Sequence, residues 1–357
     1  MAQKNELPAL VAALGVTVAL VAGGVWWLTR DGGLNLGGLL GNDSSGDTTG
    51  TTTTGNTTAT PENTGETFAQ VNATVPAGQF NYGGSTTWAP IRGSVDGVIQ
   101  SVWPNFQLTY ADPASGPPGS GAGIEMLINN QLAFAQSSRS LNPGEREAAQ
   151  QQGFELQAVP VALEGIAIAV NLDLPVEGLT LAQLRDIYTG QITSWNQVGG
   201  PDLPIQAYSR ALNGGTVEFF VDVVLGGQNL ASSVQFIDET TTALRQISEN
   251  PGAIYYASAP EVVGQCTIKP LALGRDANQL VAPYTDPYVP PENCPNQRNE
   301  TNTEAFRSGQ YPLTRQMFVI VKQDGQANQQ AGEAYSSLLL TEQGQSLLEQ
   351  AGFVRIR

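Results

Sequence analysis

The sequence contains no histidine, and only two of its 357 residues are cysteine. Histidine and cysteine supply most of the ligands for zinc, so their scarcity argues against a metal site. It also removes the usual pairs of nucleophile and general base, and no acidic pair accompanies the glycine-rich turns. We therefore expect neither a cofactor nor catalysis, and an exported enzyme that uses carboxylates is the remaining catalytic alternative.

Positive charge is also scarce. The chain has 16 Lys and Arg against 32 Asp and Glu, a formal net charge of −16. Binding to nucleic acid requires a basic face, so we expect no nucleic-acid partner. The negative charge does not exclude an anionic ligand, because local amides and one arginine can outweigh a distant diffuse field.

Charged residues are missing from positions 7–28, a run that is apolar apart from Thr17. Its length suffices for a helix to cross a bilayer, and Trp26 and Trp27 suit a membrane interface. No small-residue cleavage site follows the run, and no cysteine there could accept lipid. The sequence thus favours a retained transmembrane anchor over residues 1–30, with a cleaved signal peptide as the alternative.

Apolar residues are nearly missing from the next segment. Residues 41–67 read GNDSSGDTTGTTTTGNTTATPENTGET, a composition that cannot bury enough surface to fold. We expect residues 31–77 to form a flexible linker with a span of about 35–40 Å, by the scaling for Gly-rich chains. Such a linker would hold a folded domain clear of a membrane.

The two cysteines, Cys266 and Cys294, lie in a polar, Pro-rich region at 265–315 that reads as a long excursion. In an oxidising compartment, a disulfide between them would contribute roughly 3 kcal/mol by restricting the unfolded chain. Two unrelated free thiols are the alternative.

The remaining chain of about 280 residues is too long for one ordinary core and suits two lobes. Ala158–Val170 and Met317–Val321 are apolar without alternation, which is typical of strands buried on both faces. The pattern predicts an α/β fold with a mixed, largely parallel sheet. We expect further strands at 102–110, 205–208 and 252–256, and helices at 124–130, 180–187, 216–225, 241–247, 329–340 and 341–351.

Four polar turns fall where a strand should lead into a helix: Tyr82–Trp88, Pro118–Ile124, Gln136–Arg139 and Ser209–Thr216. Three of them carry glycine, which lets the backbone approach a ligand closely, and helix N-termini offer N–H groups without partners. Hydroxyl groups add donors, and Arg210 offers a guanidinium fork that matches an oxyanion. One such turn is weak support, but four together predict an oxyanion site.

Six segments occur in an order that resembles the PstS-type phosphate-binding proteins of ABC transporters. They are GGSTTWAP, GSGAGI, FAQSSRSL, VALEGIAIAVN, the stretch Gly178–Leu225 and YPLTRQMFVIVK, so the resemblance covers Phe80 to the C-terminus. It implies a periplasmic-binding-protein (Venus-flytrap) fold of two α/β lobes joined by two hinge strands. Residues 78–168 and 316–357 would form the first lobe and residues 169–315 the second, with the hinge near 167–171 and 313–318.

The resemblance also implies a function. The chain would bind phosphate between the lobes as a monomer and deliver it to a permease, at the periplasmic face of the bacterial inner membrane. A tethered oxyanion sensor or scavenger is the alternative. The implied ligand-binding residues are Thr86, Thr87, Ser120, Ser138, Arg139, Arg210, Gly214, Gly215 and Thr216.

Two departures from the family pattern bear on the ligand. Ser138 stands where such proteins often have an aspartate that accepts the proton of HPO₄²⁻, and Leu212 stands where an aspartate would orient the arginine. A serine can accept a hydrogen bond but does not repel fully ionised sulfate as a carboxylate would. Another oxyanion such as sulfate therefore stays open as the ligand.

Overall fold

The computed structural model describes residues 66–210 and 214–356. The predicted transmembrane anchor and residues 31–65 of the predicted linker lie outside these ranges. Within the described ranges, no helix combines the length and the apolar character that crossing a membrane requires.

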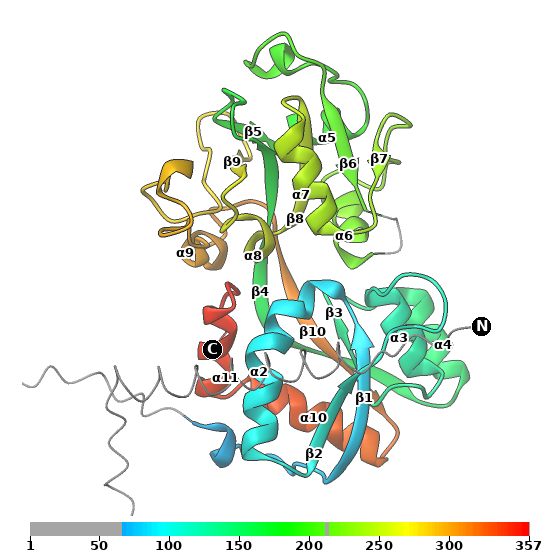
Figure 1. Cartoon of the computed structure of the whole chain (residues 1–357). Coiled ribbons are helices and arrows are strands. Elements are labelled where there is room, and N and C mark those ends of the chain that lie inside the picture. The colour runs from blue at the N-terminus through cyan, green and yellow to red at the C-terminus, as the bar shows by residue number, and fades with distance from the viewer. Residues whose placement is uncertain (1–65, 211–213, 357) are drawn as a thin grey trace, which may run out of the picture. The chain divides into compact units, whose positions relative to one another are not determined.

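The strands form a mixed sheet in the order β2-β1-β3-β10-β4-β8-β6-β7, with β9 pairing to β4 and β5 to β9 (Figure 1). The pairs of β1 with β2 and β3 are parallel, whereas β10 runs antiparallel to both β3 and β4. The strands are β1 Gly78–Gly84, β2 Phe106–Tyr110, β3 Phe134–Ser137, β4 Glu155–Asn171, β5 Gly178–Thr180, β6 Gln206–Ser209, β7 Gln235–Phe236, β8 Ala253–Ser258, β9 Ile268–Gly274 and β10 Thr314–Gln323.

The 17-residue strand β4 belongs to both lobes. Its residues 155–165 pair with β10, and residues 166–171 pair with β8 and β9. We call the part built on β1, β2, β3, β10 and the start of β4 the first lobe, and the part built on β5 to β9 and the end of β4 the second lobe. Strands β4 and β10 connect them (Figure 1).

The first lobe has helices on both faces of its sheet. One core joins α2, α10 and α11 to a sheet face that carries Phe134 and Val319, and another joins α3 and α4 to the opposite face, which carries Ala135 and Ile320. This alternation places successive strand residues in different cores. The helices are α2 Ala89–Val102, α3 Ser120–Ile128, α4 Pro143–Gln151, α10 Ala327–Leu339 and α11 Glu342–Gln350.

Packing of the first lobe begins before β1. Phe68, in the short 3₁₀ helix η2 (Phe68–Gln70), is fully buried in the core with α2. Its N–H donates to Gln343 Oε1 over 2.9 Å, and its carbonyl oxygen accepts from Trp103 Nε1 over 2.9 Å. Residues 66–77, which the sequence prediction assigned to the flexible linker, therefore include packed structure.

The second lobe has one core, in which Tyr188, Phe220 and Tyr256 pack ring against ring. The predicted helix at 180–187 is present one residue later as α5, and Thr180 caps it by accepting from Gln183 N over 3.1 Å. The helices are α5 Leu181–Tyr188, α6 Gly215–Val223, α7 Thr240–Glu249, α8 Ala259–Val262 and α9 Thr303–Arg307.

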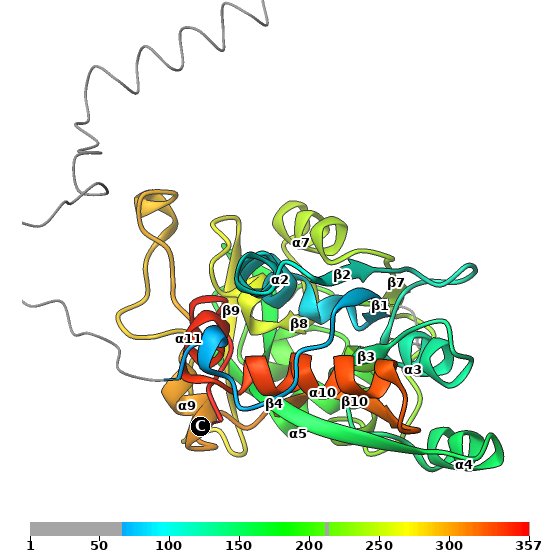
Figure 2. The ribbon, with the colours of Figure 1, turned by 90° about the horizontal axis from the view of Figure 1, so that it is seen from below.

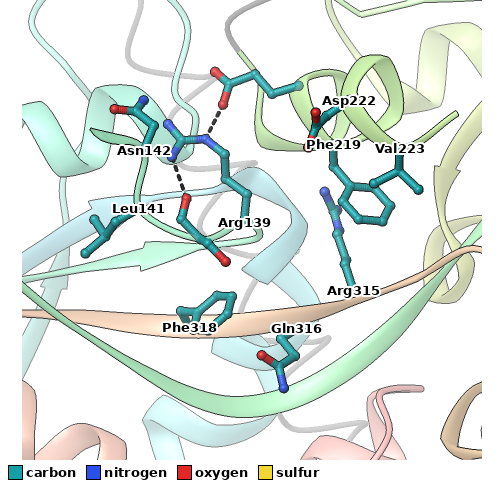
Figure 3. A pocket seen from close by; sticks show the side chains of 11 residues that line it. Arg139, Leu141, Asn142, Phe219, Asp222, Val223, Arg315, Gln316 and Phe318 are labelled. Carbon is teal, nitrogen blue, oxygen red and sulfur yellow. Dashed lines mark hydrogen bonds and ion pairs between the residues drawn. The ribbon is translucent and has the colours of Figure 1, made fainter. Parts of the chain in front are cut away.

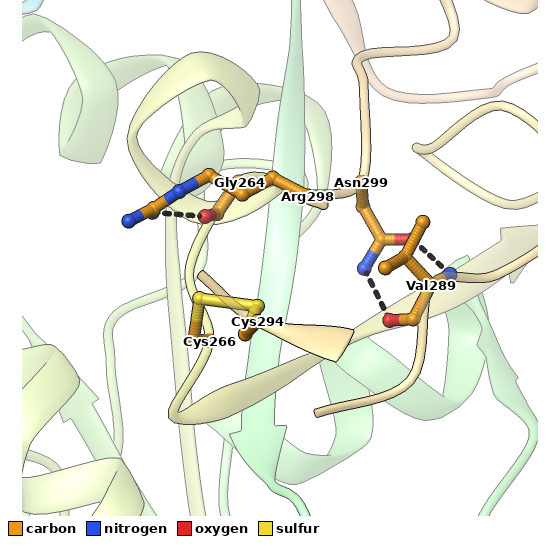
Figure 4. The surroundings of a disulfide bond; sticks show 6 residues. All are labelled: Gly264, Cys266, Val289, Cys294, Arg298 and Asn299. Atoms are coloured by element: carbon orange, nitrogen blue, oxygen red, sulfur yellow. Dashed lines mark hydrogen bonds between the residues drawn. A yellow bond between two sulfur atoms is a disulfide. The ribbon is translucent and has the colours of Figure 1, made fainter. Parts of the chain in front are cut away.

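The contacts that hold the cysteine-bearing region include a disulfide and hydrogen bonds of Arg298 and Asn299 (Figure 4). Cys266 and Cys294 form a disulfide, with their Cα atoms 5.8 Å apart, which confirms the predicted bond. Asn299 accepts from Val289 N over 2.8 Å through Oδ1 and donates to Val289 O over 3.2 Å through Nδ2. In Figure 2 the gold loop near residue 290 extends away from the neighbouring helices and strands. The region also contains β9, which the sequence prediction missed.

Candidate functional site

Three of the four predicted turns begin helices in the structure. Thr86 begins the 3₁₀ helix η3 (Thr86–Trp88) that leads into α2, Ser120 begins α3, and Gly215 begins α6 with Gly214 as its N-cap. The first N–H groups of a helix have no partner within the helix and lie at its positive end. The remaining turn, Gln136–Arg139, begins within the last two residues of β3 and continues beyond it.

Three serines of the first lobe meet in a buried hydroxyl cluster. Ser85 Oγ donates to Ser138 Oγ over 3.0 Å, and Ser120 Oγ lies 3.3 Å from Ser138 Oγ. The N–H of Ser138 donates to Ser120 Oγ over 3.1 Å. All three residues are at most 3 % exposed. Turns that are 35 and 18 residues apart along the chain thus present their hydroxyls at one point.

The start of α6 brings the second lobe against this serine cluster. A Cβ atom on Gly215 would lie 2.7 Å from Ser138 Oγ and would overlap the hydroxyl of Ser120. Only glycine permits this approach of the backbone. The predicted residues Ser120, Ser138 and Gly215, from both lobes, are therefore neighbours.

Two threonine contacts join the lobes beside the serines. Thr87 Oγ1 and Thr216 Oγ1 are 3.3 Å apart, and Arg210 Nη1 donates to Thr86 Oγ1 over 2.9 Å. Thr86 and Thr87 belong to the first lobe, whereas Arg210 and Thr216 belong to the second. Each contact thus pairs a residue of the first predicted turn with one of the last.

A second arginine, Arg315 on β10, reaches the same place, and the sequence reasoning did not select it. Its Nη2 donates to Thr216 Oγ1 over 2.8 Å and to Thr87 Oγ1 over 3.2 Å, and its Nη1 donates to the carbonyl oxygen of Gly215 over 3.0 Å. Its Nε donates to Glu164 Oε1 over 2.6 Å. The side chain of Arg315 is 2 % exposed and that of Glu164 is fully buried.

The acidic side chains behind the site are perturbed by burial. Burial raises the pKa of Glu164, and the charge of Arg315 and a hydrogen bond from Ser258 oppose the rise. Burial also raises the pKa of Glu261, at the start of α8, to about 7. The negative charge of Glu164 adds to the rise at Glu261, and the charge of Arg210 opposes it.

Arg139 is held by two carboxylates. Its Nη2 lies 2.7 Å from Glu145 Oε1 in α4, and its Nε is paired with Glu218 in α6. A cavity of about 490 Å³ lies beside these groups and is lined from both lobes, by Arg139 after β3, by Arg315 and Phe318 on β10 and by Phe219 on α6 (Figure 3). The structure thus pairs the guanidinium of Arg139 with carboxylates and not with the hydroxyls of Ser85, Ser120 and Ser138.

The predicted residues are placed as follows. Thr86, Thr87, Ser120, Ser138, Arg210, Gly215 and Thr216 come together where the lobes meet, and Gly214 precedes them as the cap of α6. Leu212 lies outside the described residues. The residues that were missed are Ser85, Glu164 and Arg315. A signal for the last two existed, because each is a charged residue inside an apolar strand and such residues are rarely buried unless they are paired.

In residues 66–210 and 214–356, no three Cys, Asp or Glu side chains gather as ligands for a metal ion. The contacts described above instead combine hydroxyls, helix N-termini and two arginines. Such groups donate hydrogen bonds to an anion.

Comparison with known proteins shows which family this chain belongs to. The phosphate-binding protein PstS of Staphylococcus epidermidis is 24% identical over 288 residues, which cover 77% of this chain and 82% of that protein. A solved substrate-binding protein with bound phosphate, assigned to a phosphate ABC transporter of Clostridium perfringens, is similar with a TM-score of 0.63 and 23% identity, covering 78% of this chain and all of that one.

An ABC-type phosphate transport receptor from Vibrio cholerae has a TM-score of 0.59 and 23% identity, covering 77% of this chain and 99% of that one. These likenesses confirm the predicted α/β periplasmic-binding-protein fold. The sequence also matches the PBP superfamily domain over residues 45–343. Since that match covers most of the chain, this protein belongs to the PBP superfamily.

Proposed function

We propose that this chain captures inorganic phosphate where its two lobes meet and delivers it to the permease of an ABC transporter. The observation that carries the proposal is the meeting of Ser120, Ser138 and Thr87 with Gly215, Thr216 and Arg210 from the other lobe. Hydroxyls, free N–H groups of helix N-termini and a guanidinium suit a tetrahedral oxyanion.

The residues have different roles in this proposal. Arg210 supplies the cation. The N-termini of α3 and α6 supply N–H groups through Ser120 and Gly215. Gly214, the N-cap of α6, has no side chain and so leaves these N–H groups accessible to the ligand. The hydroxyls of Thr86, Thr87, Ser138 and Thr216 complete the set of donors. Arg139 contributes positive charge from the side while its carboxylate partners hold it.

The relatives favour phosphate over other oxyanions. The curated protein from S. epidermidis is named for phosphate binding, and the matched C. perfringens structure contains phosphate. Ser138 in place of an acidic residue leaves sulfate as the competitor to test, because a serine does not repel a fully ionised anion.

Closure about β4 and β10 would enclose the ligand. The proposed lobes are residues 78–168 with 316–357, and residues 169–315, so their boundaries fall inside the connecting strands β4 and β10, and Arg315 lies at one of them. The two strands pair along their length, from Thr314 with Gly165 to Gln323 with Glu155. They are the connection about which the lobes would move, as hinges commonly lie at such crossings.

The proposed location is the extracytoplasmic side of the cytoplasmic membrane. In a bacterium with two membranes, this is the periplasmic face of the inner membrane. The disulfide supports this side, since disulfides persist in oxidising compartments. In this proposal the apolar residues 7–28 anchor a monomer through the Thr-rich linker. Size-exclusion chromatography with light scattering would test the monomer, and an extended N-terminal peptide in mass spectra of the membrane fraction would test the anchor.

Isothermal titration of the chain with phosphate, sulfate, arsenate and molybdate tests the function. We expect phosphate to bind with micromolar affinity or better and more tightly than sulfate. If none of the four anions gives a heat of binding, the oxyanion site is refuted. Phosphate uptake by cells that lack this chain, with and without its restoration, tests delivery.

Arg210→Ala tests the site. We expect about a 10- to 100-fold loss of phosphate affinity, because a hydrogen bond to a charged group contributes about 1.5–3 kcal/mol. Arg185→Ala is the matched control, since Arg185 is partly exposed on α5 and pairs with its neighbour Asp186. Equal affinities of the two variants would remove Arg210 from the site.

A further inference from the structure

The hydroxyl groups of Thr87 and Thr216 face each other across the lobes, and one guanidinium nitrogen contacts both. Arg315 Nη2 is 2.8 Å from Thr216 Oγ1 and 3.2 Å from Thr87 Oγ1. A guanidinium has N–H groups and no acceptor, so both threonine oxygens must accept these bonds. The hydroxyl hydrogens of Thr87 and Thr216 are thereby directed away from Arg315.

A hydroxyl that accepts from a cation also becomes a stronger donor, because hydrogen bonds in a chain polarise one another. Without a ligand, one of the two hydrogens can serve the 3.3 Å contact between the threonine oxygens. With an oxyanion at the junction, both hydrogens can point to it. The contact with Arg315 thus makes the hydroxyls of Thr87 and Thr216, which could otherwise donate or accept, hydrogen-bond donors to the ligand.

Arg315 is fixed in this position by its other contacts. Its Nε donates to Glu164 Oε1 over 2.6 Å, its Nη1 donates to Gly215 O over 3.0 Å, and Ser258 donates to the second oxygen of Glu164. Glu164 and Arg315 are also directly opposite each other on β4 and β10. A fully buried carboxylate of this kind holds its partner in one orientation, since neither charge can turn to water.

We propose that Arg315, held by Glu164, is a positioning residue that directs the hydroxyl hydrogens of Thr87 and Thr216 to the bound oxyanion and so couples ligand capture to contact between the lobes. This inference rests on the proposed function and deepens it, because it states which groups of the site donate hydrogen bonds. The threonine hydroxyls donate, and such donors suit ionised oxygens of the ligand.

A double-mutant cycle tests the proposal on the full-length chain in a mild detergent, with inorganic phosphate as the probe. Arg315→Met alone would leave Glu164 buried without its cation, so the background variant is Glu164→Leu with Arg315→Met, which replaces the ion pair by apolar groups. Thr216→Val is made in this background and in the unmodified chain. Urea unfolding shows whether each protein folds.

In the unmodified chain we expect Thr216→Val to weaken phosphate binding about tenfold, the loss of one hydrogen bond to a charged group. In the apolar background we expect the same substitution to cost about threefold or less, because an undirected hydroxyl is a weaker donor. Ser120→Ala is the control, since its hydroxyl has no bond to Arg315, and its effect should be equal in both backgrounds.

An equal loss from Thr216→Val in both backgrounds would overturn the inference and leave Arg315 a purely structural residue. If the apolar background fails to fold, Arg315→Lys takes its place, because lysine keeps the charge beside Glu164 but has one nitrogen where the guanidinium uses three to contact Glu164, Gly215 and the two threonines. The loss from Thr216→Val should shrink there too. If the unmodified chain binds no phosphate, the proposed function fails and this inference fails with it, whereas binding without coupling refutes the inference alone.

Discussion

Arg139 and Glu218 form an ion pair that joins the two lobes. Arg139 follows β3 in the first lobe, and Glu218 lies in the first turn of α6 in the second lobe. The same guanidinium contacts Glu145 of α4, in its own lobe, over 2.7 Å. The two carboxylates thus make one contact across the junction and one within a lobe, and comparable substitutions can separate their effects.

We predict that Glu218→Gln weakens phosphate binding about two- to fivefold, because a partly exposed ion pair contributes up to about 1 kcal/mol. Glu145→Gln should leave the affinity of the folded protein unchanged, because its contact with Arg139 lies within one lobe and a glutamine can still complete the capping box of α4. Titration calorimetry at low and high salt would measure both, and salt should reduce the effect of Glu218→Gln. A larger loss from Glu145→Gln than from Glu218→Gln would contradict a role for the contact between lobes.

Glu261 should make the stability of the protein depend on pH. Burial raises its pKa from 4.5 to about 7, against the charges of Arg210 and Arg315 and a hydrogen bond from Thr240, and with the repulsion of Glu164. The folded protein therefore binds more protons than the unfolded chain between these values, so this group makes stability fall as pH rises through the window.

Glu261→Gln removes this titration. We expect the variant to be more stable than the unmodified chain at pH 7.5 and the difference to vanish near pH 4.5, as measured by urea unfolding at half-unit steps of pH. A constant difference across that range would show that the carboxyl of Glu261 titrates alike in the folded and unfolded chains.

Phe68 should be essential to the first lobe although it precedes the first strand. We predict that Phe68→Ala lowers the free energy of unfolding by about 3–5 kcal/mol, as for other fully buried phenylalanines. Phe236→Ala is the control, because Phe236 is 55 % exposed and should cost at most about 0.5 kcal/mol. Urea titrations give both losses of unfolding free energy. A loss from Phe68→Ala as small as that from Phe236→Ala would show that residues 66–77 contribute no packing energy.

Reduction of the Cys266–Cys294 disulfide should destabilise the protein by roughly 3 kcal/mol, since the bond closes a loop of 29 residues in the unfolded chain. Unfolding with and without a reductant measures this cost. Alkylation without reduction should label neither cysteine in mass spectra. Phosphate affinity should not change, because both cysteines lie outside the hydroxyl and arginine contacts of the site.

Local patterns allowed much of the fold to be predicted. Thr180 with Gln183 three residues later is a capping signal, and α5 begins there. The apolar runs at 158–170 and 317–321 lie within β4 and β10. These signals depend only on neighbours in the sequence, which is why they could be read without knowledge of the tertiary structure.

Other elements were hidden by their composition. Helix α2 buries Ile91, Val95 and Ile99 at helical spacing, but Pro90 and two glycines weaken the helical signal. The strand predicted at 102–110 ends where β2 ends but was started four residues too early. Strand β9 was missed because Lys269 and Pro270 interrupt its apolar run. Both assignments depended on contacts with the rest of the sheet.

The turns of the site could be predicted from the sequence, but the pairing of Arg315 with Glu164 could not. Glycine and hydroxyl residues mark the turns in the sequence itself. Arg315 and Glu164 are 151 residues apart, and only the register of β4 against β10 makes them partners. No local pattern contains that register.

The place of β10 within the sheet also constrains the order in which the protein can be completed during synthesis. This strand lies between β3 and β4, yet it begins only at Thr314. Until the ribosome has made it, β3 and β4 have open edges that can pair with other chains. The second lobe has all its strands before that point, including its share of β4. A chain that stops before residue 314 would therefore contain a nearly complete second lobe and a first lobe that exposes two strand edges.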